Sequence, residues 1–287
     1  PRDTGRLTKL LAGECDIIAY PIAHEKIKQH PNLTLESVTS FNVGYFGFNT
    51  SKPPFNDPLV RKALSYAINK QAILETVYTG QAEIADGLIP NSSWAYDSSI
   101  TSQENSIAKA QALLAEAGYS EGFSMDLWAM PVQRAYNPDA VTMAKLIQAD
   151  LQKIGVDVEI VFDYEWATFL RKISEGEHQS VLLGWSADHP DPDNFFSTLL
   201  SCASAITGSN RTFWCNEEFD QLIQSALQTS NINRRKAYYS KALKLINEEV
   251  PLIPIAHSKR YQARANNING SLLRSIGGID FNGVTKN

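Results

Sequence analysis

The chain has 287 residues, with 26 Lys and Arg against 31 Asp and Glu, which gives a formal net charge of −5. This mild acidity argues against a nucleic-acid partner, because nucleic-acid binding usually requires a clustered basic surface. Hydrophobic residues make up 43% of the chain, yet no apolar run approaches the roughly 20 residues that a membrane span needs. The sequence therefore indicates a folded soluble protein of one large domain or two smaller ones, or a piece of such a protein.

The first third of the chain alternates predicted helices and strands. Gly13 stops a short predicted helix, and the apolar stretch 16–19 predicts a strand. Residues 41–49 are aromatic and alternating, which is the pattern of a second strand. The run Asn-Asp-Pro at 56–58 then begins a strong helix, with a polar cap and a proline at the first helical position. We expect this helix to continue to Gly80.

The middle of the chain is its most regular part. The predicted elements follow one another as strand, helix, strand, helix and strand, which is the pattern of an α/β layer. They are expected at 123–130, at a helix capped by Asn137-Pro138 and stopped by Gly155, and at 156–162, 165–174 and 180–185. Further helices are expected at 107–117, 216–229 and 232–248, and an extended, proline-containing segment at 251–257.

The three cysteines are Cys15, Cys202 and Cys215. The last two bracket a stretch rich in Ser, Thr, Gly and Asn, which is a loop-like composition. Bridging them would close a short loop, worth about 3 kcal/mol in the chain-entropy model. The alternative is a pair of buried free thiols, the commoner state in cytosolic proteins. Cys15 is then unpaired, so it is either a buried free thiol or its partner lies outside this chain.

No motif of a common enzyme class is present: there is no nucleophile elbow, Walker loop, dinucleotide-binding glycine motif, HExxH or CxxC. The one dense polar cluster, 188–194 (DHPDPDN), directly follows a predicted strand, where open α/β sheets bind ligands. An enzyme would use Asp188, Asp191 and Asp193 as metal ligands or as an acid/base pair. The plainer interpretation makes Asp193 or Asn194 the N-cap of the helix that follows.

Four segments carry a resemblance to a known family: 44–73 (GYFGFNTSKPPFNDPLVRKALSYAINKQAI), 128–138 (WAMPVQRAYNP), 184–202 (GWSADHPDPDNFFSTLLSC) and 251–263 (PLIPIAHSKRYQA). Together they resemble the extracellular solute-binding proteins of peptide ABC transporters, a cluster that includes dipeptide, oligopeptide and haem-peptide receptors. The resemblance covers essentially the whole chain in order. Two further stretches, 6–21 and 92–97, look closest to the Sap-type receptors of this family, which are associated with antimicrobial-peptide uptake.

The resemblance implies an α/β, two-lobed periplasmic-binding-protein fold of type II, cluster C, with most of the first lobe missing from this chain. Residues 40–258 would form the second, ligand-binding lobe, and residues 1–39 and 259–287 would belong to the first. The hinge would lie at two crossings, near 40–46 and 253–260. We therefore expect the chain to be the C-terminal part of a longer receptor.

The resemblance also implies a ligand site. Asp188 matches the position that pairs with the α-amino group of a bound peptide, and a carboxylate in a closed cleft needs such a cation. Arg134 matches the position that holds the ligand's C-terminal carboxylate in the dipeptide branch, with a surface ion pair as the alternative. Tyr136 and Trp185 would wall the pocket or else belong to the core. The backbone from Gly184 to Ser186 would pair with an extended peptide as an added strand.

The function implied is that of a substrate-binding subunit in the periplasm of a Gram-negative bacterium. It would capture peptides, antimicrobial peptides among them, between two lobes and deliver them to an inner-membrane ABC permease. We expect no nucleic-acid partner, no cofactor or metal, and a monomer when full length. In that oxidising compartment Cys202 and Cys215 would be bridged.

Two alternatives to a peptide receptor stay open. Haem is an alternative ligand for the same fold, with His189 and His257 as candidate axial ligands. A metal-dependent hydrolase would use the carboxylates of the 188–194 cluster. We expect a receptor rather than an enzyme, because no nucleophile or base accompanies those carboxylates.

Overall fold

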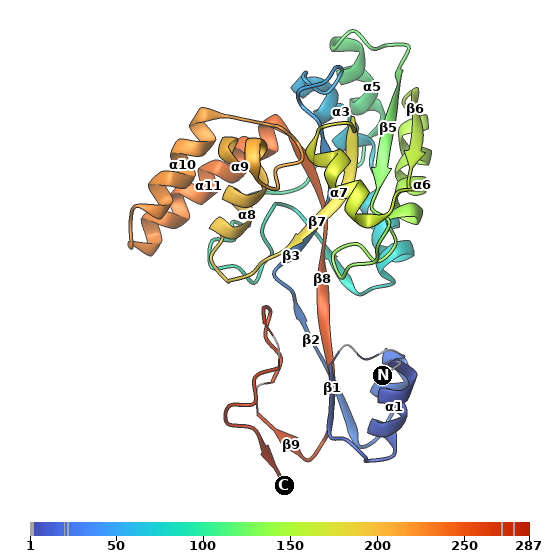
Figure 1. The fold of residues 1–287 in the computed structure, drawn as a ribbon, viewed down its shortest axis with the longest axis vertical. Helices are drawn as coiled ribbons and strands as arrows, with labels where there is room; N and C mark the ends of the chain where they lie inside the picture. The colour runs from blue at the N-terminus through green and yellow to red at the C-terminus, as the bar shows by residue number, and fades with distance from the viewer. Residues whose placement is uncertain (1–2, 20, 22, 271, 278) are drawn as a thin grey trace. The chain divides into compact units, whose positions relative to one another are not determined.

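The computed structural model describes residues 3–19, 21, 23–270, 272–277 and 279–287. Its backbone contacts divide the chain into two units (Figure 1). Unit 1 is Pro1–Ser40 together with Lys259–Asn287, and unit 2 is Phe41–Ser258. The chain therefore passes between the units twice, at 40–41 and at 258–259. The assignment of these segments to two lobes with a hinge stays a prediction.

Unit 1 is organised around the C-terminal half of one long strand. Its elements are α1 (Asp3–Leu11), β1 (Ile17–Ala19), α2 (His24–Lys28), β2 (Leu33–Thr39), β9 (Ile268–Asn269), β10 (Thr285–Lys286) and part of β8 (Leu252–Ala265). Both β1 and β2 pair antiparallel with β8, and β9 pairs with β10 in a separate short sheet. The helices α1 and α2 pack on β1 and β2, and the apolar core comprises Leu7, Leu10, Ile18, Ile27, Leu33 and Ala263.

Unit 2 is built on a mixed sheet. Its strands are β3 (Asn42–Phe48), β4 (Ala82–Ile84), β5 (Phe123–Ala129), β6 (Val156–Val161), β7 (Ser180–Ser186) and the N-terminal half of β8. Their spatial order is β8-β3-β7-β5-β6, with β4 also paired to β8. β7 runs antiparallel to β3, whereas β5 runs parallel to both β6 and β7. The alternating α/β layer predicted in the middle of the chain is thus confirmed as β5-α6-β6-α7-β7.

The helices of unit 2 gather on two sides of β3 and β7, with α8–α11 on one side and α5 and α6 on the other in the view of Figure 1. They are α3 (Pro58–Ala67), α4 (Lys70–Ile73), the π-helix η1 (Leu74–Tyr78), α5 (Ile107–Glu116), α6 (Ala140–Gln152), α7 (Trp166–Ser174), α8 (Asp193–Leu200), α9 (Cys202–Thr207), α10 (Glu217–Leu227) and α11 (Ile232–Glu249). Among the described residues, no helix has both the length and the apolar character that crossing a membrane requires.

Two helices differ from their predictions because each region contains a capping residue that the prediction did not include. The helix expected to run to Gly80 ends at Ala67, since the Asn69 side chain caps a new helix by accepting the Ala72 N–H at 3.0 Å. The helix expected to start at Asn137-Pro138 begins after Asp139, whose carboxylate accepts the Thr142 N–H at 3.0 Å.

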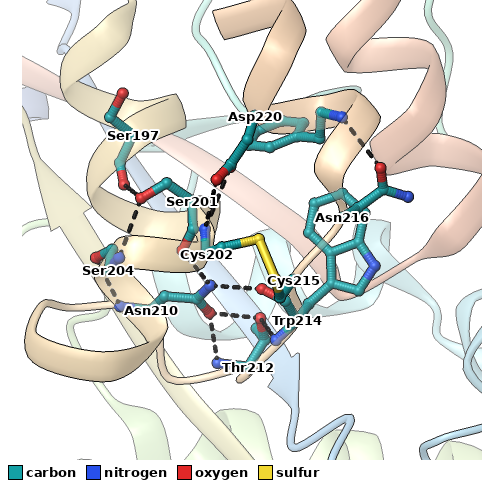
Figure 2. The surroundings of a disulfide bond; sticks show 11 residues. Ser197, Ser201, Cys202, Ser204, Asn210, Thr212, Trp214, Cys215, Asn216 and Asp220 are labelled. Carbon is teal, nitrogen blue, oxygen red and sulfur yellow. Dashed lines mark hydrogen bonds between the residues drawn. A yellow bond between two sulfur atoms is a disulfide. The ribbon is translucent and has the colours of Figure 1, made fainter. Parts of the chain in front are cut away.

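Cys202 and Cys215 form the predicted disulfide, drawn with its surroundings in Figure 2. The stretch directly after Cys202, predicted as a loop from its composition, is the short helix α9. The loop that follows is organised by Asn210, whose side chain donates to the Trp214 carbonyl at 2.9 Å and accepts the Thr212 N–H at 3.0 Å. Cys15 is half-buried and outside any disulfide of the described chain.

Candidate ligand-binding site

Two glycines of the sheet leave the space that Tyr136 occupies. Gly184 on β7 lies opposite Gly44 on β3. A Cβ at Gly184 would lie 2.2 Å from the Tyr136 ring, and one at Gly44 would lie 2.2 Å from the Tyr136 carbonyl oxygen. The Tyr78 hydroxyl donates to that same carbonyl at 2.7 Å. The half-buried Tyr136 is therefore fixed on the sheet by both its ring and its backbone, as only glycine at both positions allows.

Arg134 lies on the same hairpin turn as Tyr136. Arg134 and Asn137 exchange two backbone hydrogen bonds of 3.0 Å each, which closes the turn. The exposed guanidinium of Arg134 lies over the ring of Trp166, 5.4 Å from its centroid. Burial raises the pKa of the Tyr136 hydroxyl, and the nearby guanidinium partly offsets this. Within the described ranges no carboxylate forms an ion pair with Arg134, so the surface ion pair is not seen.

The end of β7 has a backbone edge that β5 does not cover. The Ala187 N–H donates to the Phe41 carbonyl at 2.8 Å, which shows that odd-numbered residues of β7 bond to β3. The N–H and C=O groups of Gly184 and Ser186 therefore point to the opposite edge. β5 pairs with that edge only as far as Leu182. Beyond this residue no strand of the described chain adds to it.

Asn194 joins two of the predicted site residues. The indole N–H of the half-buried Trp185 donates to Asn194 Oδ1 at 2.8 Å, and the backbone N–H of Asp188 donates to the same oxygen at 3.0 Å. The prediction of Asp193 or Asn194 as a helix N-cap is wrong. The N-cap is Pro192, which makes no side-chain cap bond and whose φ of −55° and ψ of −30° are already helical.

The three carboxylates of the 188–194 cluster have separate surroundings. Asp188 is exposed, and no hydrogen bond or ion pair to its carboxylate is present within the described residues. Asp191 forms a bidentate ion pair with Arg235, at 2.9 Å for each contact. Asp193 accepts a hydrogen bond of 2.5 Å from the Ser197 hydroxyl, and burial raises its pKa. In the part of the chain described, no three such groups converge on one metal position.

The two candidate haem ligands lie in different environments. His257 is only 4% exposed, and its Nδ1 lies 2.6 Å from the Asn42 carbonyl oxygen. Burial lowers the pKa of His257 to about 4, so this ring is neutral at physiological pH. His189 is exposed, and its Nε2 lies 3.3 Å from Asn194 Nδ2.

Sequence reasoning missed Gly44, Tyr78 and Asn194 as parts of this site. Gly44 lies in an aromatic strand, where an isolated glycine can mark a close approach of other backbone. This was the available signal. The roles of Tyr78 and Asn194 depend on partners more than five residues away in sequence, and no local sequence pattern predicts these contacts.

Comparison with known proteins identifies the family. The model of the bacterial extracellular solute-binding proteins, family 5 (middle region), matches residues 1–206. The chain therefore belongs to this family of solute-binding proteins. The predicted α/β fold of the two-lobed periplasmic-binding proteins is confirmed by the same match and by the solved structures of relatives.

Several relatives cover this chain almost completely. The dipeptide-binding protein of Escherichia coli K12 is 42% identical over 99% of this chain and 54% of its own length. Heme-binding protein A of Haemophilus influenzae is 40% identical, and the peptide transport periplasmic protein SapA of Salmonella typhimurium is 38% identical, each over 99% of this chain and 52% of its own length. The chain thus spans about half the length of these relatives.

A solved structure with a ligand is also similar. The dipeptide binding protein from Pseudoalteromonas sp. SM9913 in complex with Met-Leu is 46% identical and has a TM-score of 0.81. The match covers 100% of this chain and 57% of that one. The dipeptide, haem and Sap relatives differ little in their identity to this chain, so the choice of ligand is argued from the site.

Proposed function

We propose that this chain forms the ligand-binding part of a periplasmic substrate-binding subunit, which captures short peptides and delivers them to an inner-membrane ABC permease. The observation that carries the proposal is the exposed carboxylate of Asp188, which has no partner within the described residues while Asp191 and Asp193 are both bonded. A carboxylate left free in this way is suited to a cation that a ligand supplies. The α-amino group of a peptide is such a cation.

The open edge of β7 supports a peptide rather than an isolated amine. The N–H and C=O groups of Gly184 and Ser186 point to the edge that β5 leaves uncovered past Leu182. An extended peptide can add to such an edge by backbone hydrogen bonds that do not depend on its side chains. Asp188 follows two residues after Ser186, so the amino terminus of an added peptide would find its counter-charge at the end of the strand.

Arg134 supports ligands that are short. Its guanidinium is exposed, held over Trp166, and without an intramolecular ion pair among the described residues. A planar guanidinium binds a carboxylate bidentately, which suits the C-terminus of a dipeptide or tripeptide. Longer peptides, antimicrobial ones included, would share the Asp188 contact and extend past Arg134. We propose dipeptides and tripeptides as the first ligands to test.

Haem is not favoured by the histidines of this site. His257 is buried and lies against the Asn42 carbonyl, so it is not available as an axial ligand without rearrangement. His189 is exposed but lies beside the Asn194 amide. A haem ligand would therefore rely on other residues of the protein.

The test is isothermal calorimetry on protein expressed from the complete gene, with Met-Leu and its N-acetylated form as ligands. Asp188→Asn keeps the shape and removes the charge, so Met-Leu affinity should fall about 30-fold or more. N-acetylation should weaken the wild type equally and add little to the variant. Asp157→Asn, which removes an exposed carboxylate on β6, is the matched control and should leave binding unchanged.

A second arm tests the size of the ligand. Arg134→Ala should weaken Met-Leu binding but leave a tetrapeptide extended at its C-terminus nearly unaffected. If N-acetyl-Met-Leu binds the wild type as tightly as Met-Leu, the ammonium contact is wrong. Haem, which has no amino terminus, then becomes the ligand to titrate.

A further inference from the structure

Asn194 is the one side chain that holds both Trp185 and Asp188 in the described structure. Its Oδ1 accepts the Trp185 indole N–H at 2.8 Å and the Asp188 backbone N–H at 3.0 Å. The same amide presents Nδ2 to His189 Nε2 at 3.3 Å. One amide in the first turn of α8 therefore bonds both to the end of β7 and to the loop between the two elements.

The orientation of this amide is determined by its partners. Both Trp185 and Asp188 can only donate at these atoms, so the carbonyl oxygen of Asn194 must face them. Turning the amide over would place its NH2 group against two other N–H donors. His189 Nε2 then faces the Asn194 NH2 group, so this ring nitrogen is the acceptor in their contact.

The amide is presented from a well-anchored helix. The next two residues of α8, Phe195 and Phe196, are both fully buried. The loop before Asn194 is tied down by Asp191, whose carboxylate is bound by Arg235, and that guanidinium lies 5.0 Å from the centroid of the Trp94 ring. Asn194 is therefore anchored on both sides along the chain where it accepts the Trp185 and Asp188 N–H groups.

We propose that Asn194 is a positioning residue that preorganises Asp188 for the ligand's ammonium group, an inference that rests on the proposed peptide-binding function. It touches no ligand. It fixes the backbone that carries the Asp188 carboxylate and the ring plane of Trp185 beside it, which reduces the ordering that binding would otherwise require. Asp188 is exposed and Trp185 is half-buried, so we expect folding to depend less on these two bonds than on contacts of the core.

The experiment compares Asn194→Leu with Asn194→Asp in protein expressed from the complete gene. Leucine has the same number and branching of side-chain heavy atoms but accepts no hydrogen bond, whereas aspartate keeps oxygens for both N–H donors. The readout is the ratio of affinities for Met-Leu and N-acetyl-Met-Leu, which reports recognition of the ammonium group alone. The leucine variant should lower this ratio about tenfold, and the aspartate variant should retain most of it.

A spectroscopic readout and a control complete the test. The Trp185 indole ¹H–¹⁵N resonance should move upfield in the leucine variant and stay downfield in the aspartate variant, because it reports the hydrogen bond directly. Ser197→Ala removes a different hydrogen bond of α8, to Asp193, and should leave both readouts unchanged.

The outcomes separate the two proposals. If wild-type protein does not distinguish Met-Leu from its acetylated form, the proposed function fails. If the wild type distinguishes them and Asn194→Leu does so equally well, the function stands and the positioning role of Asn194 is overturned. A lowered ratio with an unmoved Trp185 indole resonance also overturns it, because the hydrogen bond was then not the cause.

Discussion

Lys70 is a charged residue in the interior of unit 2. The residue is 9% exposed, and its ammonium group donates a hydrogen bond to the Ala85 carbonyl at 3.0 Å. Burial lowers the pKa of Lys70 to about 8, an effect that the charge of Asp86 partly offsets. A cavity of about 20 Å³ lined by Ser65, Lys70 and Asn247 lies beside it, which is room for about one water molecule.

The depressed pKa predicts that stability rises with pH at alkaline values. The unfolded chain binds a proton at Lys70 up to a pKa near 10.5, whereas the folded chain releases it near 8. Unfolding therefore takes up a proton between these values, and folding gains up to about 3 kcal/mol across the window. Urea unfolding at pH 7.5 and at pH 10 tests this. Between these two pH values, the free energy of unfolding of the wild type should rise by about this amount relative to that of Lys70→Met. If the difference in unfolding free energy between wild type and Lys70→Met is the same at both pH values, the burial of a charged amine is contradicted.

At the scale of single elements, the disulfide closes a segment that is already held in place. The Thr50 N–H donates to the Thr212 carbonyl at 2.8 Å, and His178 Nε2 lies 2.8 Å from the Arg211 carbonyl oxygen. The Asp220 carboxylate accepts the N–H at the start of α9 (Figure 2). We therefore expect the folded loop to keep these contacts without the covalent bond, and the disulfide to act chiefly on the unfolded chain.

Replacing Cys202 and Cys215 with alanine should lower the free energy of unfolding by about 3 kcal/mol and keep a single cooperative transition. Urea titration with and without a thiol reductant measures this: the reductant should destabilise the wild type and leave the double variant unchanged. Cys15→Ser serves as the control, because Cys15 is outside any disulfide of the described chain and its variant should remain sensitive to reductant. A reductant-insensitive wild type would count against the bridge.

The ends of helices were predictable where the signal is local. The helix at Pro58 begins where three adjacent residues indicate it, because Asp57 accepts the Leu59 N–H at 2.8 Å. Its end at Ala67 was not predictable to the same degree. Asn69 starts the next helix partly because Asp150, distant in sequence, accepts its N–H at 2.8 Å.

The candidate site could not be assembled from local signals. Tyr136 meets Gly184 and Gly44 only because β7 and β3 are neighbours in the sheet, and no periodicity in the sequence encodes that pairing. Resemblance to a family supplied the predicted ligand contacts of Asp188 and Arg134. Without it, Asp188 was only a carboxylate of the 188–194 cluster at a strand end, and Arg134 was a candidate for a surface ion pair. The placement of Tyr136 on the sheet depends on tertiary contact, and the ligand contacts of Asp188 and Arg134 stay a proposal.

At the scale of the whole molecule, β8 is common to both units. Its C-terminal half pairs with β1 and β2, and its N-terminal half with β3 and β4. A chain ending at Val250 lacks this strand, so hydrogen exchange should find the amides of β1 and β2 unprotected. The amides of β5 and β6, which pair with each other, should keep more protection. A chain ending at Asn266 retains β8 and should restore protection in β1 and β2; equal protection in the two truncated chains would contradict the prediction.

The shared strand also determines when the sheets of both units can be completed. The four partners of β8 all precede it in the chain, the last of them ending at Ile84, whereas β8 begins at Leu252. Until β8 joins them, β1, β2 and β4 have no strand partner among the described residues, and β3 has only β7. Open strand edges of this kind let chains pair with one another and aggregate. One late event then completes the sheets of both units. We therefore expect the unfolded chain to be most prone to aggregation before β8 has paired with these strands.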